Sequence, residues 1–152
     1  MADETPIVPT ENTTTLSESI LITVKRACDI EDDDDAFDSD IIRSINSYLQ
    51  ILWMQNVGVS GFKVTNEDQT WAEFLGPHAD NLQMAVSYIC KKVKLAFDPP
   101  SSSTLYNAYK EQADELGWYL GVESDILSGY GWQDTARIIH EALYEEDDDE
   151  ED

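Results

Sequence analysis

Apolar side chains recur every three or four positions in four separate stretches of the chain, and this spacing restricts the fold more than any other feature. A period of about 3.6 residues places such side chains on one face of an α-helix, where they can be buried together. The stripes consist of Leu16, Ile20, Val24 and Cys28; Phe37, Ile41, Ile45, Tyr48, Leu49, Leu52 and Trp53; Leu82, Val86, Ile89, Cys90, Val93 and Phe97; and Leu105, Tyr109, Gln112, Leu116 and Leu120. The sequence therefore predicts an all-α fold with helices over about 15–28, 36–56, 79–97 and 103–120.

Residues that cap helices occur at several predicted starts. Thr15 and Thr70 are each followed three positions later by glutamate. This is the spacing of a capping box, in which the threonine hydroxyl accepts a hydrogen bond from a free backbone N–H group. Thr15 predicts the start of the first helix, and Thr70 predicts a short helical turn. The serines at 101–103 are candidate caps for the helix 103–120.

Glycine and proline mark the predicted helix ends. Gly58 and Gly121 are placed to end the second and fourth helices. Asp98-Pro99-Pro100 ends the third, because proline cannot continue a helix and restricts the residue before it to extended geometry. The intervening 59–64 is too short for a helix and is either a small strand or an extended crossover. The bundle thus has three long helices, a shorter one and an irregular middle segment.

The acidic residues are concentrated in two runs. Residues 29–40 contain eight carboxylates and the last eight residues, 145–152, are all acidic, so the two runs hold half of the 32 acidic residues. An all-acidic segment cannot bury apolar surface and is expected to be disordered. The predicted organisation is given by four ranges: 1–14, a flexible leader; 15–122, the helical domain; 123–144, a linker and an extra C-terminal helix; and 145–152, a disordered acidic tail.

The net charge of −23 excludes several classes of function. Binding to nucleic acid or to an anionic membrane needs clustered basic residues, and only Lys91, Lys92 and Lys94 form a cluster. These three lie in the last turns of helix 79–97, where they either complement the negative helix end or contact acidic groups of a neighbour. No apolar run is long enough to span a bilayer and the first residues do not resemble a signal peptide, so we expect the protein to stay in the compartment where it is made.

No pattern of residues indicates catalysis, a cofactor or a metal site. The acidic run at 29–40 lacks the glycine that an EF-hand loop needs at its sixth position. The two histidines, His78 and His140, belong to no nucleophile or zinc motif. Cys28 and Cys90 are 62 positions apart and lie on apolar stripes, so they are expected to be free thiols that act as small hydrophobic residues. We expect neither an enzyme nor a bound cofactor or metal.

The aromatic residues suggest which positions are core and which bind partners. Trp53, Trp71 and Trp118 lie on or near apolar helix faces and are expected in the core. Tyr130 and Trp132 alternate with glycines outside the predicted core, where they either anchor a partner or pack on the chain's own helices. A short helix follows, and it needs a surface to dock on because about ten residues are marginal alone. Its apolar positions are Ile138, Ile139, Ala142 and Leu143.

Several of these segments, in this order, resemble the small head–tail connector proteins of tailed, long-tailed bacteriophages. The similar segments are an Asp-rich loop with Ala36-Phe37-Asp38; Ile41-Ile42-x-x-Ile45-Asn46-x-x-Leu49; Val57-Gly58-Val59; Thr70-Trp71-Ala72-Glu73-Phe74-Leu75; a lysine-bearing helix ended by Phe97-Asp98-Pro99-Pro100; and Glu115-Leu116-Gly117-Trp118-Tyr119-Leu120. The resemblance covers about residues 16–126. Its motif residues are Trp71, Phe97, Asp98, Pro99, Pro100 and Trp118.

The resemblance implies a structural protein of the virion neck, made in the cytoplasm of the host bacterium. Such proteins assemble as a homo-oligomeric ring, commonly twelve-fold, below the portal protein. The ring joins the portal to the stopper or tail-completion protein and lines the channel for double-stranded DNA. An acidic lumen suits this role, because it repels the phosphates of passing DNA. We expect Tyr130, Trp132, Ile138, Ile139 and Leu143 to dock on the portal or on a neighbouring subunit.

An acidic inhibitor that imitates DNA and blocks a host nucleic-acid-binding protein is the alternative. Such a mimic would also explain the charge of −23 without a ring. It would need carboxylates spread over a folded face, whereas half of the acidic residues here lie in two runs. We therefore prefer the hypothesis of a head–tail connector to that of a DNA mimic.

Overall fold

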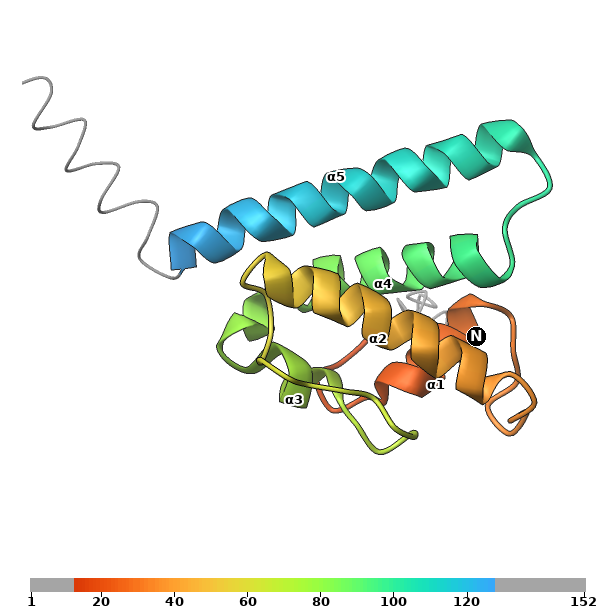
Figure 1. Ribbon diagram of the computed structural model, residues 1–152, viewed down its shortest axis with the longest axis horizontal. Coiled ribbons are helices and arrows are strands. Elements are labelled where there is room, and N and C mark those ends of the chain that lie inside the picture. The colour runs from red at the N-terminus through yellow and green to blue at the C-terminus, as the bar shows by residue number, and fades with distance from the viewer. Residues whose placement is uncertain (1–12, 128–152) are drawn as a thin grey trace, which may run out of the picture.

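The computed structural model describes residues 13–127, which form five α-helices and one 3-10 helix (Figure 1). The elements are α1 (Ile20–Ala27), α2 (Asp38–Met54), α3 (Trp71–Leu75), η1 (Gly76–Asn81), α4 (Leu82–Phe97) and α5 (Ser103–Leu127). Within the described range no strand forms, and residues 59–64 are an irregular crossover. The predicted all-α bundle with three long helices is confirmed.

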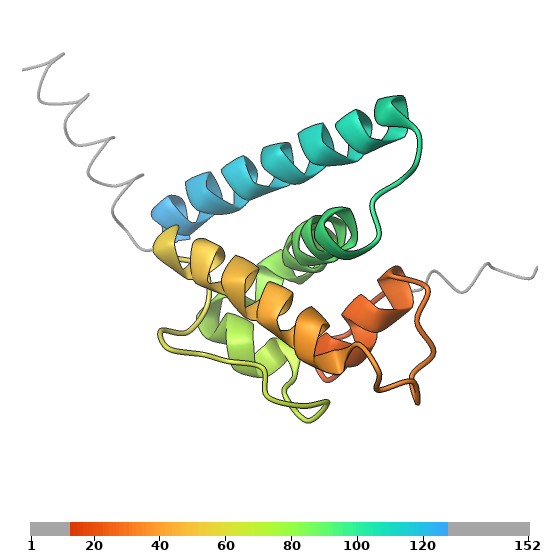
Figure 2. The same ribbon diagram turned by 45° about the vertical axis from the view of Figure 1, so that its right-hand side comes forward.

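Helix α4 lies at the centre of the bundle. It packs against α1, α2 and α5, with α5 along one side and α1 and α3 on the other (Figures 1 and 2). The buried apolar side chains come from every helix and form one core: Ile20, Leu21, Val24, Cys28, Ile41, Ile45, Leu49, Leu52, Val57, Val64, Trp71, Phe74, Leu75, Leu82, Ala85, Val86, Tyr88, Ile89, Val93 and Leu120. Burial of these stripes drives the packing of the bundle.

The first helix begins at Ile20, so the start predicted at Thr15 is wrong. Ser19 is the N-cap, and its Oγ accepts a hydrogen bond from the backbone N–H of Ile22 at 3.3 Å. The residues before it pair instead with the segment leading into α3. Ile20 N donates to Gln69 O and Trp71 N donates to Glu18 O. This pairing satisfies backbone groups that a helix from Thr15 would have used internally.

Helix α2 ends earlier than predicted, at Met54. Asn56 adopts a left-handed conformation with φ of 64°, and the N–H of Val57 closes the helix by donating to Leu52 O. Gly58, predicted as the cap, has another role: a Cβ there would lie 2.3 Å from the ring of Phe74. Glycine at this position therefore lets the chain pass directly against α3.

The predicted caps of two other helices are confirmed. Thr70 Oγ1 accepts a hydrogen bond from the N–H of Glu73 at 3.4 Å, which starts α3. Ser102 Oγ accepts one from the N–H of Leu105 at 3.4 Å, in the first turn of α5.

Helix α5 passes through Gly121 and continues to Leu127, the last described residue, so the end predicted at Gly121 is wrong. A small-residue stripe holds this helix close to the bundle. At Gly117, an added Cβ would approach the ring of Tyr88 to 2.9 Å. Ser124 is buried and its Oγ donates a hydrogen bond to Asn56 O. These contacts continue past Gly121 and stabilise the extra turns.

Only one of the three tryptophans expected in the core is buried there. Trp71 is fully buried, which confirms that prediction, but Trp53 is 42% exposed and Trp118 is 64% exposed. Each of the two lies one position beyond a buried residue, Leu52 or Gly117. One residue turns a helix by about 100°, which is enough to carry a side chain from the covered face to solvent. The core prediction for Trp53 and Trp118 is therefore wrong.

Candidate interaction surfaces

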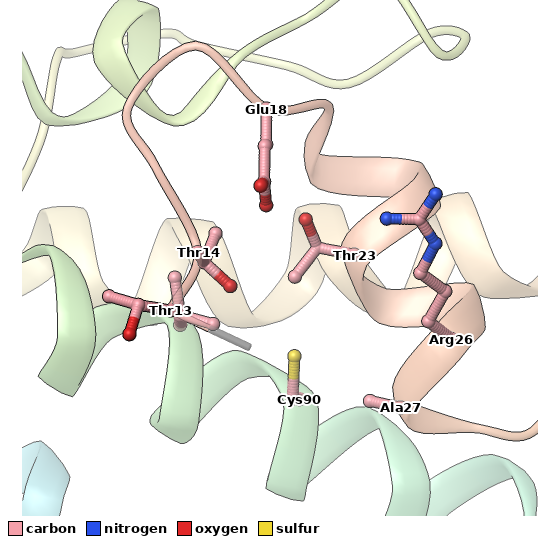
Figure 3. A pocket seen from close by; sticks show the side chains of 8 residues that line it. Thr13, Thr14, Glu18, Thr23, Arg26, Ala27 and Cys90 are labelled. Atoms are coloured by element: carbon pink, nitrogen blue, oxygen red, sulfur yellow. The ribbon is translucent and has the colours of Figure 1, made fainter. Parts of the chain in front are cut away.

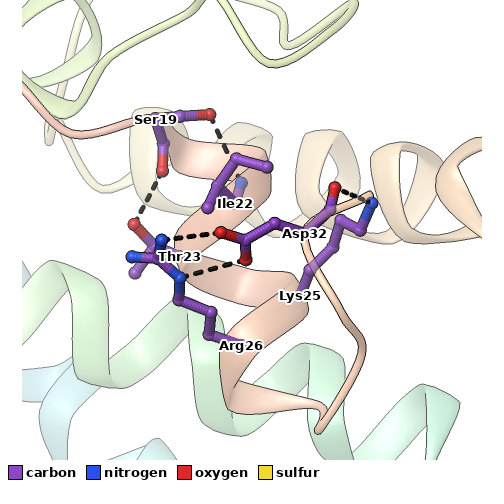
Figure 4. A network of polar contacts seen from close by, with 6 residues as sticks. All are labelled: Ser19, Ile22, Thr23, Lys25, Arg26 and Asp32. Carbon is purple, nitrogen blue, oxygen red and sulfur yellow. Dashed lines mark hydrogen bonds and ion pairs between the residues drawn. The ribbon is translucent and has the colours of Figure 1, made fainter. Parts of the chain in front are cut away.

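Arg26 of α1 holds the acidic segment that precedes α2 (Figure 4). Its Nε donates to Asp32 Oδ1 at 3.0 Å and its Nη2 donates to Asp32 Oδ2 at 2.7 Å. This two-point hydrogen bond lowers the pKa of the Asp32 carboxyl below its ordinary value and raises that of the Arg26 guanidinium. Both side chains are largely exposed, so the pair orients the segment more than it stabilises the fold.

Lys25 fixes the same segment from inside the bundle. Its side chain is only 2% exposed, and a buried ammonium group needs polar partners. Lys25 Nζ donates to the backbone oxygen of Asp32 at 3.1 Å and lies 2.9 Å from Oδ1 of Asp38 in the first turn of α2. The side chains at 31–35 are exposed. The acidic run is therefore displayed at one edge of the bundle by two basic residues of α1.

Two of the three lysines of α4, Lys92 and Lys94, form ion pairs within the same chain, and the third, Lys91, lies over an aromatic ring. Lys92 Nζ donates to Asp114 of α5 at 2.6 Å, and this hydrogen bond lowers the pKa of the Asp114 carboxyl. Lys94 Nζ lies 3.5 Å from Asp29 Oδ2. Lys91 Nζ lies 5.6 Å from the centre of the Tyr109 ring. The cluster thus joins α4 to α5 and to the acidic segment, in addition to its favourable position near the helix end.

The motif Phe97-Asp98-Pro99-Pro100 forms the turn between α4 and α5. Phe97 packs edge-on against Phe37 with 5.3 Å between ring centres. The N–H of Asp98 closes α4 by donating to Lys94 O at 2.8 Å. Pro99 is exposed and Pro100 is half-buried. The motif residues therefore stop one helix and connect it to the next.

An exposed apolar surface lies where the end of α2 meets α5. Met54 is 71% exposed, and with Trp118 and Val122 it lines an open groove of about 370 Å³. Tyr119, also exposed, stacks edge-on against Trp118 at 5.0 Å between ring centres. We call Met54, Trp118, Tyr119 and Val122 the α2/α5 patch. Because exposed apolar side chains that lie together often belong to protein interfaces, this patch is a candidate interaction surface. Sequence reasoning missed it because it placed Trp118 in the core.

A family model described as phage connector protein matches residues 20–126, from the first residue of α1 to the last turn of α5. The chain belongs to the phage connector protein family. No curated protein and no solved structure matches this connector. The matched range contains the acidic segment, the lysines of α4, the Phe97–Pro100 turn and the α2/α5 patch.

A cavity lies between α1, α4 and the residues before α1 (Figure 3). It measures about 660 Å³ and is lined by polar side chains, including Thr14, Glu18 and Arg26, with the Cys90 thiol at its edge. Within residues 13–127, no group of three His, Cys, Asp or Glu side chains is placed to hold a metal ion. In the same range no helix is long and apolar enough to cross a membrane.

Both cysteines are free, and Cys28 is buried in the core, as the sequence predicted for a small hydrophobic residue. Burial raises the pKa of the Cys28 thiol from 9.0 to about 11 and that of the Cys90 thiol to about 12. A thiol with such a pKa stays protonated at neutral pH and is a poor nucleophile.

At pH 8 we expect a thiol reagent to label Cys28 roughly 100-fold and Cys90 roughly 1000-fold more slowly in the folded connector than in the urea-unfolded chain. The reason is that each unit by which the pKa rises lowers the thiolate fraction about tenfold. The folded state favours the protonated thiols. Their contribution to stability is therefore complete below about pH 9 and is lost as the pH rises through 11 and 12. Labelling kinetics and urea titrations at pH 7 to 11 measure both effects. Equal labelling rates in the folded and unfolded chain would contradict the raised pKa values of the two thiols.

The five residues expected to dock on a partner lie outside the described residues. They are Tyr130, Trp132, Ile138, Ile139 and Leu143.

Proposed function

We propose that this connector is a head–tail connector subunit that assembles as a ring, twelve-fold, below the portal of a tailed phage. The ring joins the portal to the stopper or tail-completion protein in the virion neck and lines the channel for double-stranded DNA. The match of the connector family over residues 20–126 carries this proposal. The role is structural rather than catalytic, and synthesis takes place in the cytoplasm of the host bacterium.

The distribution of charge supports a channel through which DNA slides. The lysines of α4 are engaged with Asp114, Asp29 and the Tyr109 ring, which reduces their capacity to hold phosphates. The carboxylates at 31–35 remain exposed. A surface with exposed carboxylates and engaged cations repels a polyanion rather than binding it.

The α2/α5 patch supports contact with a neighbouring subunit. It presents a tryptophan, a tyrosine and a methionine, residue types that are enriched at the centres of protein interfaces. In the proposed ring, this patch packs against a different surface of the next copy, as a cyclic ring requires.

The C-terminal residues Tyr130, Trp132, Ile138, Ile139 and Leu143 are proposed to contact the portal. Aromatic residues flanked by glycine can adapt to a groove and contribute most of the energy of an interface.

Electron microscopy of the purified full-length connector mixed with portal protein tests the proposal. We expect a ring stacked on the portal, and we expect Tyr130→Ala/Trp132→Ala to weaken this complex at least about tenfold. Absence of any ring or portal complex would contradict the connector role. Inhibition of a host nuclease by the purified chain would instead support the DNA-mimic alternative.

A further inference from the structure

A second groove separates α2 from the crossover at 57–64. It measures about 550 Å³, and the aromatic rings of Trp53, Phe62 and Phe74 line it. Asn46 of α2 sets its width, because its Nδ2 donates to Val64 O at 2.9 Å and its Oδ1 accepts from Val64 N at 2.8 Å. These two hydrogen bonds hold the crossover at a fixed distance from α2. The groove is therefore a built feature of the fold.

Two basic side chains, Arg43 and Lys63, line this groove, and few acidic groups neutralise their charge. Lys63 makes no ion pair and stacks on no aromatic ring within residues 13–127, and it is exposed. Arg43 lies 3.5 Å from Asp40, but both side chains are largely exposed and such a pair is weak. The chain as a whole carries a charge of −23. An aromatic groove with two available cations therefore fits an occupant that combines apolar side chains with carboxylates.

The C-terminal segment of this chain has that composition. The 25 residues that follow Leu127 contain two aromatic residues close to their start, Tyr130 and Trp132. The apolar stripe of Ile138, Ile139 and Leu143 comes next, and the all-acidic run 145–152 closes the segment. Aromatic and aliphatic side chains match the groove wall, and the carboxylates match Arg43 and Lys63.

The last described turns of α5 lie near one end of this groove. The last turns of α5 lie beside the end of α2 (Figures 1 and 2). Ser124 Oγ donates to Asn56 O, and Asn56 is three residues before Val59, which lines the groove. Twenty-five residues can extend over about 80 Å, so reach is not a constraint. A covalent connection also gives the segment a local concentration of the order of millimolar.

We propose that residues 128–152 bind the groove between α2 and the crossover of the same chain in the free protomer. In this bound state, the residues proposed to dock on the portal are buried in the groove. The portal protein must therefore displace residues 128–152 from the groove before it can bind them. This proposal goes beyond the head–tail role, and its test uses the free protomer. The groove proposal and the proposed head–tail role can therefore fail independently of each other.

Photo-crosslinking in the full-length chain tests the proposal. The photoreactive residue p-benzoylphenylalanine replaces Gln50, which is exposed and lines the groove, or Gln112, which is exposed on α5 and serves as the matched control. A mixture of ¹⁴N and ¹⁵N chains at low concentration distinguishes crosslinks within one chain from crosslinks between two. Mass spectrometry then locates the crosslinked peptide.

We expect position 50 to crosslink to residues 128–152 of the same chain, and position 112 to give no such product. Arg43→Glu/Lys63→Glu is expected to reduce the yield roughly tenfold, whereas Lys91→Glu/Lys110→Glu, with the same change in charge, leaves it unchanged. Sodium chloride at about 0.5 M should also reduce the crosslinking yield of the chain that carries no charge reversal, because salt screens the attraction. This measurement does not require a charge-reversal variant to fold. Failure to crosslink to 128–152, mixed ¹⁴N–¹⁵N products as the main species, or insensitivity to charge reversal and salt would each overturn the proposal.

Discussion

Trp71→Ala is expected to lower the free energy of unfolding by about 3–5 kcal/mol, a large part of the stability of a domain of this size. Trp71 is fully buried in the core. Its Nε1 donates a hydrogen bond to Thr23 Oγ1 at 3.1 Å, which joins α3 to α1. The substitution removes the indole ring, opens a cavity and leaves the hydroxyl of Thr23 without this donor.

Urea titration followed by circular dichroism measures this effect. Trp118→Ala is the matched control, because the same indole is removed from a side chain that is 64% exposed. We expect the control to change stability by less than about 1 kcal/mol. Equal losses in the two variants would show that Trp71 does not hold the core together.

Met54→Asp/Trp118→Asp is expected to prevent ring assembly while leaving the protomer folded. Both side chains are exposed in the protomer, so charge at these positions costs little stability there. In the proposed ring they pack against the next subunit, and two buried unpaired carboxylates would weaken each contact at least about 100-fold. Sedimentation velocity and electron microscopy measure the oligomer.

The control for this prediction is Leu105→Asp, which adds charge to another exposed apolar position of α5, outside the α2/α5 patch. Rings should survive this substitution. If rings form equally well in the unaltered protein, in Met54→Asp/Trp118→Asp and in Leu105→Asp, the α2/α5 patch is not the contact between subunits.

The amino-acid sequence by itself predicted which stretches form the long helices, the cap of α3 and the turn between α4 and α5. The stripes in α2 and α4, the Thr70 cap of α3 and the turn at Phe97–Pro100 all appear where local patterns place them. Each of these features depends on neighbouring residues alone. They are an apolar side chain about every 3.6 residues, a hydroxyl that accepts a backbone hydrogen bond, and a proline that cannot continue a helix. The family resemblance used the same local segments, and the family match over 20–126 confirms it.

Only the tertiary structure decided where α1 begins, that α5 continues past Gly121 and which tryptophans are buried. The start of α1 depends on backbone pairing with residues about 50 positions away, and the last turns of α5 depend on Ser124 bonding to Asn56. Trp118 is exposed because the small residue Gly117 faces α4 in its place and lets the two helices approach. A helical repeat shows which side chains share a face, but the packing partners determine how much of that face is covered.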